Sequence, residues 1–226
     1  MNSRDKLILE ADAYDFFVFD CDGVLLDSNK LKTQSFREAL KNYPCGPVNK
    51  FISYHEENGG VSRYDKLDYF FKTILNRNDF SQEYQEALER FSNISKKHLF
   101  QAKLVPSIKE FLQKTLSLKK KCIVASGSNE IELIELLNHL ELDNYFSRIF
   151  GSPNNKKEIL KCFLQENKHL KTGLFFGDAY NDYKTALNFG LDFIFVSFNS
   201  DWNIDSETLT KKGIKTIASF ENIEII

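Results

Sequence analysis

A buried strand that ends in two carboxylates constrains this chain more than any other feature. Residues 16–19 form an uninterrupted apolar run, and Asp20, Asp22 and Gly23 follow it closely. Such runs are typical of strands buried in a parallel sheet, and open α/β sheets place their chemistry at the carboxyl ends of these strands. Asp20 and Asp22 would repel each other unless a cation lay between them. We therefore expect a site for a hard divalent ion, Mg²⁺, which prefers oxygen ligands and commonly accompanies phosphate.

A second apolar run, at residues 122–125, is followed by Ser126, Gly127 and Ser128 and then by a helical pattern. A hydroxyl group at the end of a strand, a glycine that lets the backbone approach closely and a helix amino terminus together suit a bound phosphate oxygen. The same residue types also form ordinary helix caps, with Ser128 or Asn129 in that role. The segment predicts a phosphate contact that includes Gly127 and Ser128, or a cap.

Two lysines, Lys156 and Lys157, follow a short apolar strand at residues 149–150 and begin another helical pattern. A lysine near the carboxylates would offset negative charge on an attacking carboxylate and on a transferring phosphoryl group. The alternative is a solvated pair at a helix start. Residues alone leave open which lysine would face the site.

A fourth apolar run, at residues 174–176, again stops at a carboxylate. Asp178 follows directly after Gly177, and Asp182 comes four residues later. Together with Asp20 and the carbonyl oxygen of Asp22, these carboxylates would complete an oxygen-rich cage around Mg²⁺. The chain thus predicts a metal site that joins two strand ends.

In this order, the four segments resemble the four motifs of the haloacid dehalogenase-like phosphohydrolases. The family usually has lysine followed by proline in the third motif, so Lys156 is the better match although Lys157 follows it. The resemblance implies a catalytic set and a metal set: Asp20 as nucleophile, Asp22 as general acid and base, Ser126 and Lys156 on the transferring oxygens, and Asp20, Asp22, Asp178 and Asp182 around Mg²⁺.

The order of the predicted elements indicates an α/β fold with an insertion. Strand and helix patterns alternate after residue 102, which is typical of βαβ units and a mostly parallel sheet, and residues 216–218 are expected to form an edge strand. Before it, helical patterns cover 29–42, 64–75 and 81–99, with no convincing strand. We predict a Rossmann-like core made of residues 1–28 and 103–226, with a helical cap at 29–102. In the resembling family such a cap covers the active site and opens to exchange ligands.

The pattern predicts a polar, glycine-containing loop at residues 55–63, between helical patterns. Pro44, Gly46 and Pro47 are predicted to end the helix before it. The Gly-Val-Ser-Arg at the end of this loop resembles the cap substrate loop of β-phosphoglucomutases. The resemblance implies that Arg63 holds a substrate phosphate, with His55 and Ser62 in the same substrate-binding loop. The alternative is a surface loop in which Ser62 caps a helix and Arg63 is solvated. The mutases also carry a histidine soon after the first motif, where this chain has Lys30 or Lys32.

The composition restricts the classes of binding partner that this chain is expected to have. The 226 residues carry a net charge of −2 without basic blocks, which argues against a dedicated nucleic-acid surface. The four cysteines show neither zinc-site spacing nor a redox motif. Residues 1–13 have no signal-peptide core, and no later apolar stretch is long enough to span a membrane. We expect a cytoplasmic monomer or homodimer that binds a small phosphorylated metabolite and neither nucleic acid nor membrane.

The sequence therefore predicts a Mg²⁺-dependent phosphatase that hydrolyses a small phosphorylated metabolite, such as a sugar phosphate, through an aspartyl-phosphate. The nearest rival is a sugar phosphomutase, which would return the phosphoryl group to a sugar. A halide-removing enzyme of the same superfamily would lack the second Asp and need no metal, whereas Asp22 and Asp178 are both present. A catalytically silent binding or regulatory module is a fourth hypothesis, and the intact motifs argue against it.

Overall fold

The computed structural model describes residues 6–226 and is built on a six-stranded parallel sheet. The strands lie in the order β6 (Arg148–Ser152), β5 (Lys121–Asn129), β2 (Phe16–Phe19), β7 (Gly173–Gly177), β8 (Asp192–Val196) and β9 (Lys215–Ile217). This confirms the predicted α/β class and the parallel sheet. Strand β9 occupies the edge that residues 216–218 were expected to form.

Strand β2 is central, and its alternating side chains build two cores. Phe17 and Phe19 belong to the core on one face, together with apolar residues of α5 (Ile108–Ser117) and α6 (Glu130–His139). Phe16 and Val18 belong to the core on the other face, with residues of α7 (Lys156–Glu166) and α8 (Tyr180–Asn188). Because both faces are covered, all four β2 residues are fully buried, which is why the strand reads as a continuous apolar run.

Two short strand pairs lie outside the main sheet, and neither was predicted. Strand β1 (Leu7–Leu9) pairs in parallel with β10 (Ile223–Ile225). Strand β3 (Leu26–Asp27) pairs antiparallel with β4 (Lys103–Leu104), where the chain leaves the sheet domain and returns to it. Strands of two or three residues are too short for an alternating pattern. The remaining short elements are η1 (Ala11–Ala13), η3 (Asp143–Tyr145), α9 (Ser206–Lys211) and η4 (Phe220–Asn222).

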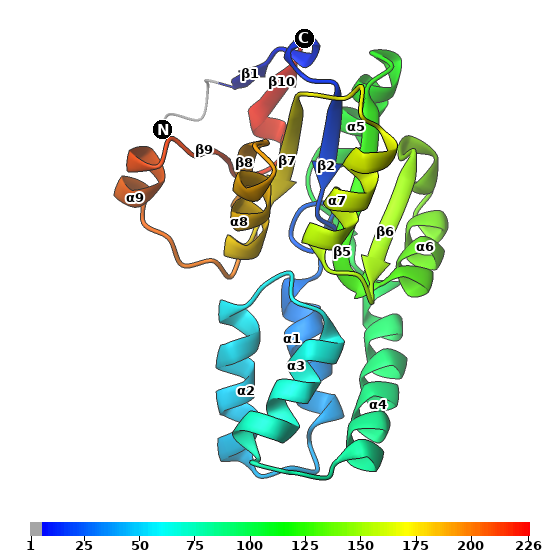
Figure 1. Cartoon of the computed structure of the whole chain (residues 1–226), viewed down its shortest axis with the longest axis vertical. Helices are drawn as coiled ribbons and strands as arrows, with labels where there is room; N and C mark the ends of the chain where they lie inside the picture. Colours follow the sequence, from blue (N-terminus) through cyan, green and yellow to red (C-terminus); the bar gives the residue numbers. More distant parts are fainter. Residues whose placement is uncertain (1–5) are drawn as a thin grey trace.

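The inserted segment forms a separate helical block, which lies below the sheet domain in Figure 1. Its elements are α1 (Asn29–Ala39), α2 (Cys45–Glu57), α3 (Arg63–Tyr69), the π-helical turn η2 (Phe70–Ile74) and α4 (Ser81–Leu99). The block has its own apolar core, in which Phe36 stacks on Phe91 with ring centroids 3.9 Å apart. Helix α4 has the bounds that the sequence pattern predicts.

Helix α2 corrects the predicted loop at residues 55–63. The helix starts at Cys45, directly after Pro44, and runs to Glu57, so His55 lies in its last turn and only residues 58–62 form the loop. Proline is tolerated in a first helical turn, where the backbone N–H has no intrahelical partner. Pro44 and Pro47 therefore mark the beginning of a helix here, and not only the end of the one before it.

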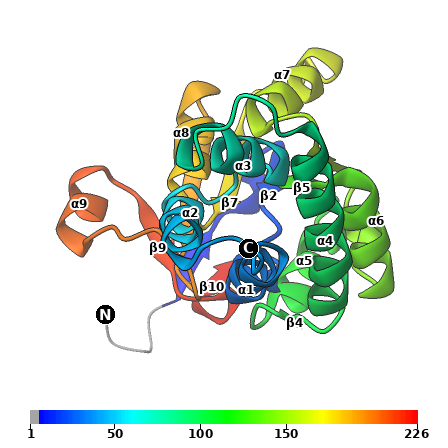
Figure 2. The ribbon, with the colours of Figure 1, turned by 90° about the horizontal axis from the view of Figure 1, so that it is seen from below.

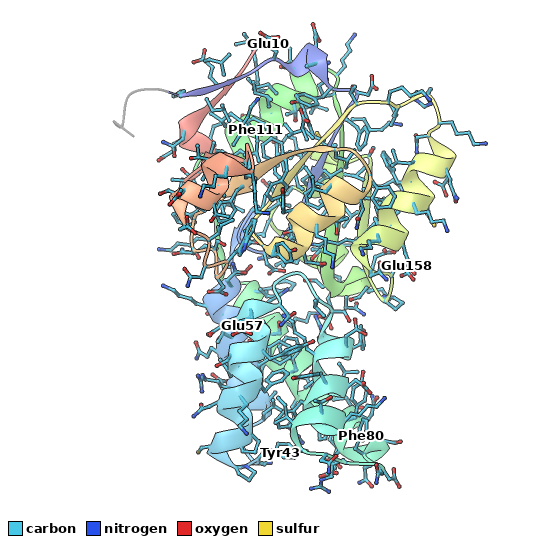
Figure 3. All side chains as sticks on the ribbon, turned by 60° about the vertical axis from the view of Figure 1, so that its left-hand side comes forward. Glu10, Tyr43, Glu57, Phe80, Phe111 and Glu158 are labelled. Atoms are coloured by element: carbon cyan, nitrogen blue, oxygen red, sulfur yellow. The ribbon has the colours of Figure 1, made fainter. Side chains whose placement is uncertain are left out.

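The inserted helices sit over the carboxyl ends of the central strands. Viewed from below, α1, α2, α3 and α4 lie in front of β2, β5 and β7 (Figure 2). Glu57 lies at the end of the block that faces the sheet domain, while Tyr43 and Phe80 lie at the opposite end (Figure 3). Within residues 6–226, no helix combines the length and the apolar character needed to cross a membrane.

Candidate active site

The site begins where β2 ends. The backbone N–H of Asp20 still donates to Phe176 O at 3.0 Å, so Asp20 continues the pairing with β7 and stays buried, with 2% of its surface exposed. Gly23 then turns the chain with a φ of 75°. A Cβ at Gly23 would lie 2.2 Å from Asp178 Oδ2, so glycine is required here both for the turn and for the close approach of Asp178.

Three carboxylates meet at the ends of β2 and β7. One oxygen from each of Asp20, Asp178 and Asp182 lies within 4.8 Å of the others, and all three residues are buried. Asp178 Oδ2 accepts a hydrogen bond from Asn29 Nδ2 at 2.6 Å. Asp182 Oδ2 accepts one from Ala179 N at 3.2 Å, so Asp182 also holds the start of α8. The cluster joins two of the strand ends that the sequence singles out.

Lys156 is the cation inside this cluster. Its Nζ lies 2.8 Å from Asp20 Oδ1 and 2.5 Å from Asp182 Oδ1, and only 2% of the residue is exposed. Burial opposes its charge, but the attraction of Asp182 and Asp20 outweighs burial and raises the pKa of Lys156. Lys157 is exposed, so the geometry assigns the position beside Asp20 to Lys156.

The acidic cluster has the chemistry of a site for a hard divalent cation. Asp20 Oδ1 faces Lys156 Nζ at 2.8 Å and has no other polar partner within residues 6–226. Burial raises the pKa of Asp20, and burial together with Asp20 and Asp182 raises that of Asp178 well above its usual range. A nearby cation would favour the ionised form of both carboxyl groups, Asp20 and Asp178, so the cluster fits a metal ion. Both oxygens of Asp182 already accept hydrogen bonds.

Asp22 points to a different set of partners. Its Oδ1 accepts a hydrogen bond from Ser28 Oγ at 2.6 Å, and its Oδ2 forms an ion pair with Lys32 and accepts from Ser128 Oγ at 3.3 Å. Burial opposes ionisation, but Lys32 and the hydroxyl of Ser28 lower the pKa of Asp22 below its usual value. The side chain of Asp22 is not part of the acidic cluster around Asp20.

The carboxyl end of β5 contributes backbone and one hydroxyl group. Gly127 and Ser128 line the cavity described below, and Ser128 Oγ accepts a hydrogen bond from Lys32 Nζ at 2.7 Å. Ser126 is fully buried beneath them, and its hydroxyl accepts from Ser128 N at 3.1 Å. Ser126 therefore shapes this end of β5, while Asn129 caps α6 by accepting from Glu132 N at 3.1 Å.

A cavity lies between the strand ends and the inserted helices. It leaves about 60 Å³ of room for the centres of water molecules, and its wall includes Asp20, Asp22 and Asp178 from the sheet domain and His55 and Arg63 from the inserted helices. About 10–15 Å³ of such room holds one water, so this arrangement admits a group of a few atoms. The cavity thus brings the predicted catalytic carboxylates and two predicted cap residues to one space.

The inserted loop at residues 58–62 covers the cavity closely. A Cβ at Gly127 would lie 2.6 Å from the carbonyl oxygen of Gly60, and one at Gly59 would lie 2.8 Å from the Cβ of Ala179. A Cβ at Gly60 would lie 3.1 Å from Lys156 Nζ. Glycines on both sides therefore allow the loop to rest on the strand ends, next to the acidic cluster.

Arg63 and Ser62 hold the loop in place. Ser62 Oγ accepts from Asp65 N at 3.2 Å and caps α3. The two terminal nitrogens of Arg63 donate to the two carboxylate oxygens of Glu132 on α6, at 3.0 and 2.6 Å, and Nη1 also donates to Ser92 at 2.8 Å. Arg63 is 5% exposed and its guanidinium lies 4.9 Å from the ring centre of Phe91. Its charge is thus satisfied by a carboxylate of the sheet domain.

Several residues of the site lie outside the sequence motifs that predicted it. Asn29 and Glu132 lie in helices, where a single polar residue is indistinguishable from a surface residue. Lys32 was one of two candidates for the position that a histidine holds in the mutases, and the structure brings it, rather than the exposed Lys30, to Asp22. Lys66 lies one turn after Arg63, and this spacing on a helix was the one available indication that it faces the same side.

A profile of the haloacid dehalogenase-like hydrolases matches residues 17–196, a span that contains all four predicted motifs and the inserted helices. The chain belongs to the haloacid dehalogenase-like hydrolase family. This confirms the family that the sequence motifs indicate.

A similar protein and two structures with the same fold carry phosphatase and mutase names. A phosphorylated carbohydrates phosphatase from Thermotoga maritima is 27% identical over 140 residues, which are 59% of this chain and 60% of that protein. A predicted phosphoglycolate phosphatase from Haemophilus somnus 129pt superposes with a TM-score of 0.74 at 20% identity, over 92% of this chain and 95% of that one. A β-phosphoglucomutase from Clostridium difficile has a TM-score of 0.71 at 20% identity, over 93% of each chain. The two structures share the fold of this hydrolase.

Proposed function

We propose that this hydrolase is a Mg²⁺-dependent phosphatase of small phosphorylated metabolites in the cytoplasm. One observation carries the proposal: Asp20 presents a buried oxygen at the wall of a cavity, 2.8 Å from Lys156 Nζ and beside Asp178, with no other polar partner within residues 6–226. A carboxylate in this position is free to attack an electrophile that enters the cavity. The name of the Thermotoga maritima relative supports a phosphorylated carbohydrate as the substrate class.

The reaction has two displacement steps at phosphorus. The Asp20 carboxylate attacks the phosphorus in line, the bond to the ester oxygen breaks, and Asp22 donates a proton to the leaving alcohol. Asp22 then removes a proton from a water molecule that attacks the aspartyl-phosphate, which releases inorganic phosphate and restores Asp20. Lys32 favours ionised Asp22, so the acid role requires the entering phosphate to draw Lys32 away from Asp22.

Positive charge from this chain stabilises the transferring oxygens. Lys156 is fixed beside Asp20 by its contact with Asp182, and Lys32 and Ser128 lie together at the other carboxylate. Fixed donors of this kind stabilise developing charge without having to reorganise. Asp20 and Asp178, with the carbonyl of Asp22 and with Asp182 directly or through water, would hold the Mg²⁺, which supplies further charge neutralisation at the phosphoryl group.

The inserted helices act as a cap in this proposal. With residues 29–102 as one moving unit, closure brings the loop at 58–62 onto the strand ends and excludes bulk water from the aspartyl-phosphate. The ion pair between Arg63 and Glu132 supports closure, because it joins α3 of the insertion to α6 of the sheet domain. His55 and Ser62 complete the cap side of the site, His55 on the cavity wall and Ser62 as the cap of α3.

A sugar phosphomutase is the second candidate. The observation that favours it is the Gly-Val-Ser-Arg loop, which lies over the cavity and resembles the mutase substrate loop. A mutase would transfer the phosphoryl group from Asp20 to a second hydroxyl of a sugar and release no inorganic phosphate. Lys32 takes the place of the histidine that the mutases carry, and we therefore rank hydrolysis first.

The experiment is a phosphate-release assay across sugar, nucleotide and small-acid phosphates, with Mg²⁺ or with a chelator, using the wild type and the isosteric variant Asp20→Asn. We expect release that requires Mg²⁺ and falls at least about a thousandfold in Asp20→Asn, because amides are poor nucleophiles. Asp79→Asn, at an exposed position of the insertion, is the control and should behave as the wild type.

Three results would contradict the proposal in different ways. Full activity in a chelator would exclude the metal, and near-normal turnover by Asp20→Asn would exclude this nucleophile. Net isomerisation of a sugar phosphate without release would select the mutase. No turnover of any ester by the wild type would favour a binding or regulatory module.

A further inference from the structure

A buried lysine in the inserted helices has no part in the proposed reaction. Lys66 lies on α3, 3% exposed, and both Lys66 and His55 of α2 line the cavity opposite the strand ends. Fully buried lysines are rare unless paired with a carboxylate. A buried ammonium group at this position therefore needs a group that compensates its charge.

In the part of the chain that the structure describes, the hydrogen-bond partners of Lys66 are neutral. Lys66 Nζ lies 2.7 Å from His55 Nδ1 and 3.2 Å from the carbonyl oxygen of His55. Burial, and then the positive charges of Lys66 and Lys32, lower the pKa of His55 well below its usual value, so its ring is neutral. When Lys66 is charged, its ammonium donates and Nδ1 of His55 accepts. Within residues 6–226, Lys66 has no carboxylate within the 4.0 Å of an ion pair. A lysine has three donors, and these contacts use two.

The electrostatic surroundings of Lys66 favour the binding of a negatively charged group. Burial, with a further contribution from Lys32, lowers the pKa of Lys66 to about 7, and Asp22, Asp201 and Asp178 act in the opposite direction. Asp201 and Glu56 lie on the same cavity wall but are exposed, so water screens them. An anion placed inside the cavity would be screened far less and would restore the charge of Lys66.

The neighbouring arginine differs in this respect. Arg63 lines the same cavity, but its guanidinium is engaged by both oxygens of Glu132. The reacting phosphate has its own donors in Lys156, Lys32 and Ser128, and none of these contacts Lys66. The inserted helices contribute three cations to this wall. Lys32 is paired with Asp22 and Arg63 with Glu132, which leaves Lys66 with free capacity for an anion.

We propose that Lys66, oriented by His55, binds a second anionic group of the substrate at the end away from the reacting phosphate. The inference rests on the proposed phosphatase function and specifies its substrate class: a small phosphorylated metabolite that also carries a carboxylate or a second phosphate. Both groups present anionic oxygens to the free donor of Lys66, and the experiment separates them.

The test compares substrates that differ at the remote end. One set is glycerol 3-phosphate against 3-phosphoglycerate, which adds a carboxylate. The other is fructose 6-phosphate against fructose 1,6-bisphosphate, which adds a phosphate. We expect the wild type to prefer the anionic member of at least one set by tenfold or more in kcat/KM, and the set with the larger ratio identifies the anion.

The variant Lys66→Met should reduce that preference at least tenfold, mainly through KM, because the reacting end of the site is unchanged. The control Lys72→Met removes an exposed lysine of the same insertion and should leave the preference as it is in the wild type. Lys66→Met should also melt at the same temperature as the wild type or higher, since it removes a buried charge that lacks a carboxylate partner. A purely structural lysine would lower the melting temperature and affect all substrates alike.

Binding without turnover separates this inference from the proposed function. The variant Asp20→Asn, with and without Lys66→Met, is titrated with 3-phosphoglycerate, glycerol 3-phosphate and the two fructose phosphates, and the shift in melting temperature is measured. A larger shift with an anionic member that disappears with Lys66→Met supports the site, even if no ester is hydrolysed. Equal shifts for all ligands, or shifts unaffected by Lys66→Met, overturn it, even if hydrolysis is efficient.

Discussion

The sheet domain and the inserted helices bury charge in different ways. At the strand ends Lys156 lies between two carboxylates, 2.8 Å from Asp20 and 2.5 Å from Asp182, at a position that the topology of the sheet creates. In the insertion, Lys66 is buried against a neutral histidine, and Arg63 finds its carboxylate only on the sheet domain. The first arrangement is complete within one domain. The second depends on what lies across the cavity, whether α6 or a ligand.

This difference indicates which region of the molecule is responsible for each part of the function. A site built on the ends of β2 and β7 keeps its geometry because both strands are buried on both faces. The inserted helices have a separate apolar core, and they contact the acidic cluster through Asn29, which donates to Asp178, and through the loop at 58–62. We therefore expect chemistry to be lost by changes at the strand ends, and substrate selection and closure to be altered by changes in the insertion.

The largest effect should come from Lys156→Met, which tests whether the sheet-domain site is complete in itself. The change leaves Asp20 and Asp182 without their cation, and breaking a buried pair of this kind costs about 3–5 kcal/mol in the free energy of unfolding. Turnover should fall at least about a thousandfold. Urea unfolding and the phosphate-release assay measure the two effects. Lys161→Met, at an exposed position of the same helix, is the matched control.

The destabilisation of Lys156→Met should depend on pH with a defined sign. An unpaired buried carboxylate has a folded-state pKa above its unfolded value, so it destabilises the protein at pH values above that pKa and the penalty disappears as protonation removes the charge. Burial already raises the pKa of Asp20. The variant should therefore lose less stability at pH 5 than at pH 8. A loss that is independent of pH would indicate a packing defect at Lys156 instead.

The success of prediction from the sequence also differs between the sheet domain and the inserted helices. The strand ends were predicted in detail, because a buried parallel strand must be apolar along its length and a carboxylate directly after it stands out, as at Asp20 and Asp178. The start of α2 was missed because Pro44 and Pro47 occur both at helix ends and in first turns. The roles of Arg63 and Lys66 could not be predicted from the sequence, since they depend on which residues of α6 and α2 lie opposite, 69 and 11 positions away in the chain.

The next effect in size concerns the contact between the two regions. Gly127→Ala would place a Cβ 2.6 Å from Gly60 O, and the three nearest atoms all belong to the inserted loop. The sheet domain should keep its melting temperature, while kcat/KM should fall about ten- to a hundredfold because the loop is pushed off the strand ends. Faster hydrogen exchange of residues 58–62 would locate the defect.

Gly46→Ala is the matched control for this change. Gly46 lies in α2, and a Cβ there would meet nothing within 4 Å, so activity should be unchanged and the helix slightly more stable. If Gly127→Ala retained full activity with unchanged exchange, the close contact between the loop and β5 would not be needed for function.

The smallest expected effect separates two roles for Arg63. Two ion pairs join α4 or α3 of the insertion to α6: Arg63 with Glu132, which is largely buried, and Lys96 with Glu135, about half exposed. Glu132→Gln removes the charge that faces Arg63 and should lower kcat/KM about three- to tenfold for every substrate, because charged hydrogen bonds of buried groups contribute more than exposed pairs. Glu135→Gln is the matched control and should have no measurable effect.

A double-mutant cycle with Arg63→Met decides what the arginine does. If Arg63 holds the insertion closed, Arg63→Met and Glu132→Gln should give similar losses on all substrates, and the double variant should be hardly worse than either, since both remove the same interaction. If Arg63 instead binds a remote group of the substrate, only Arg63→Met should be costly, and only for substrates that carry that group. The bidentate contact with Glu132 leads us to expect the first pattern. Additive losses confined to one substrate would transfer the anion site from Lys66 to Arg63.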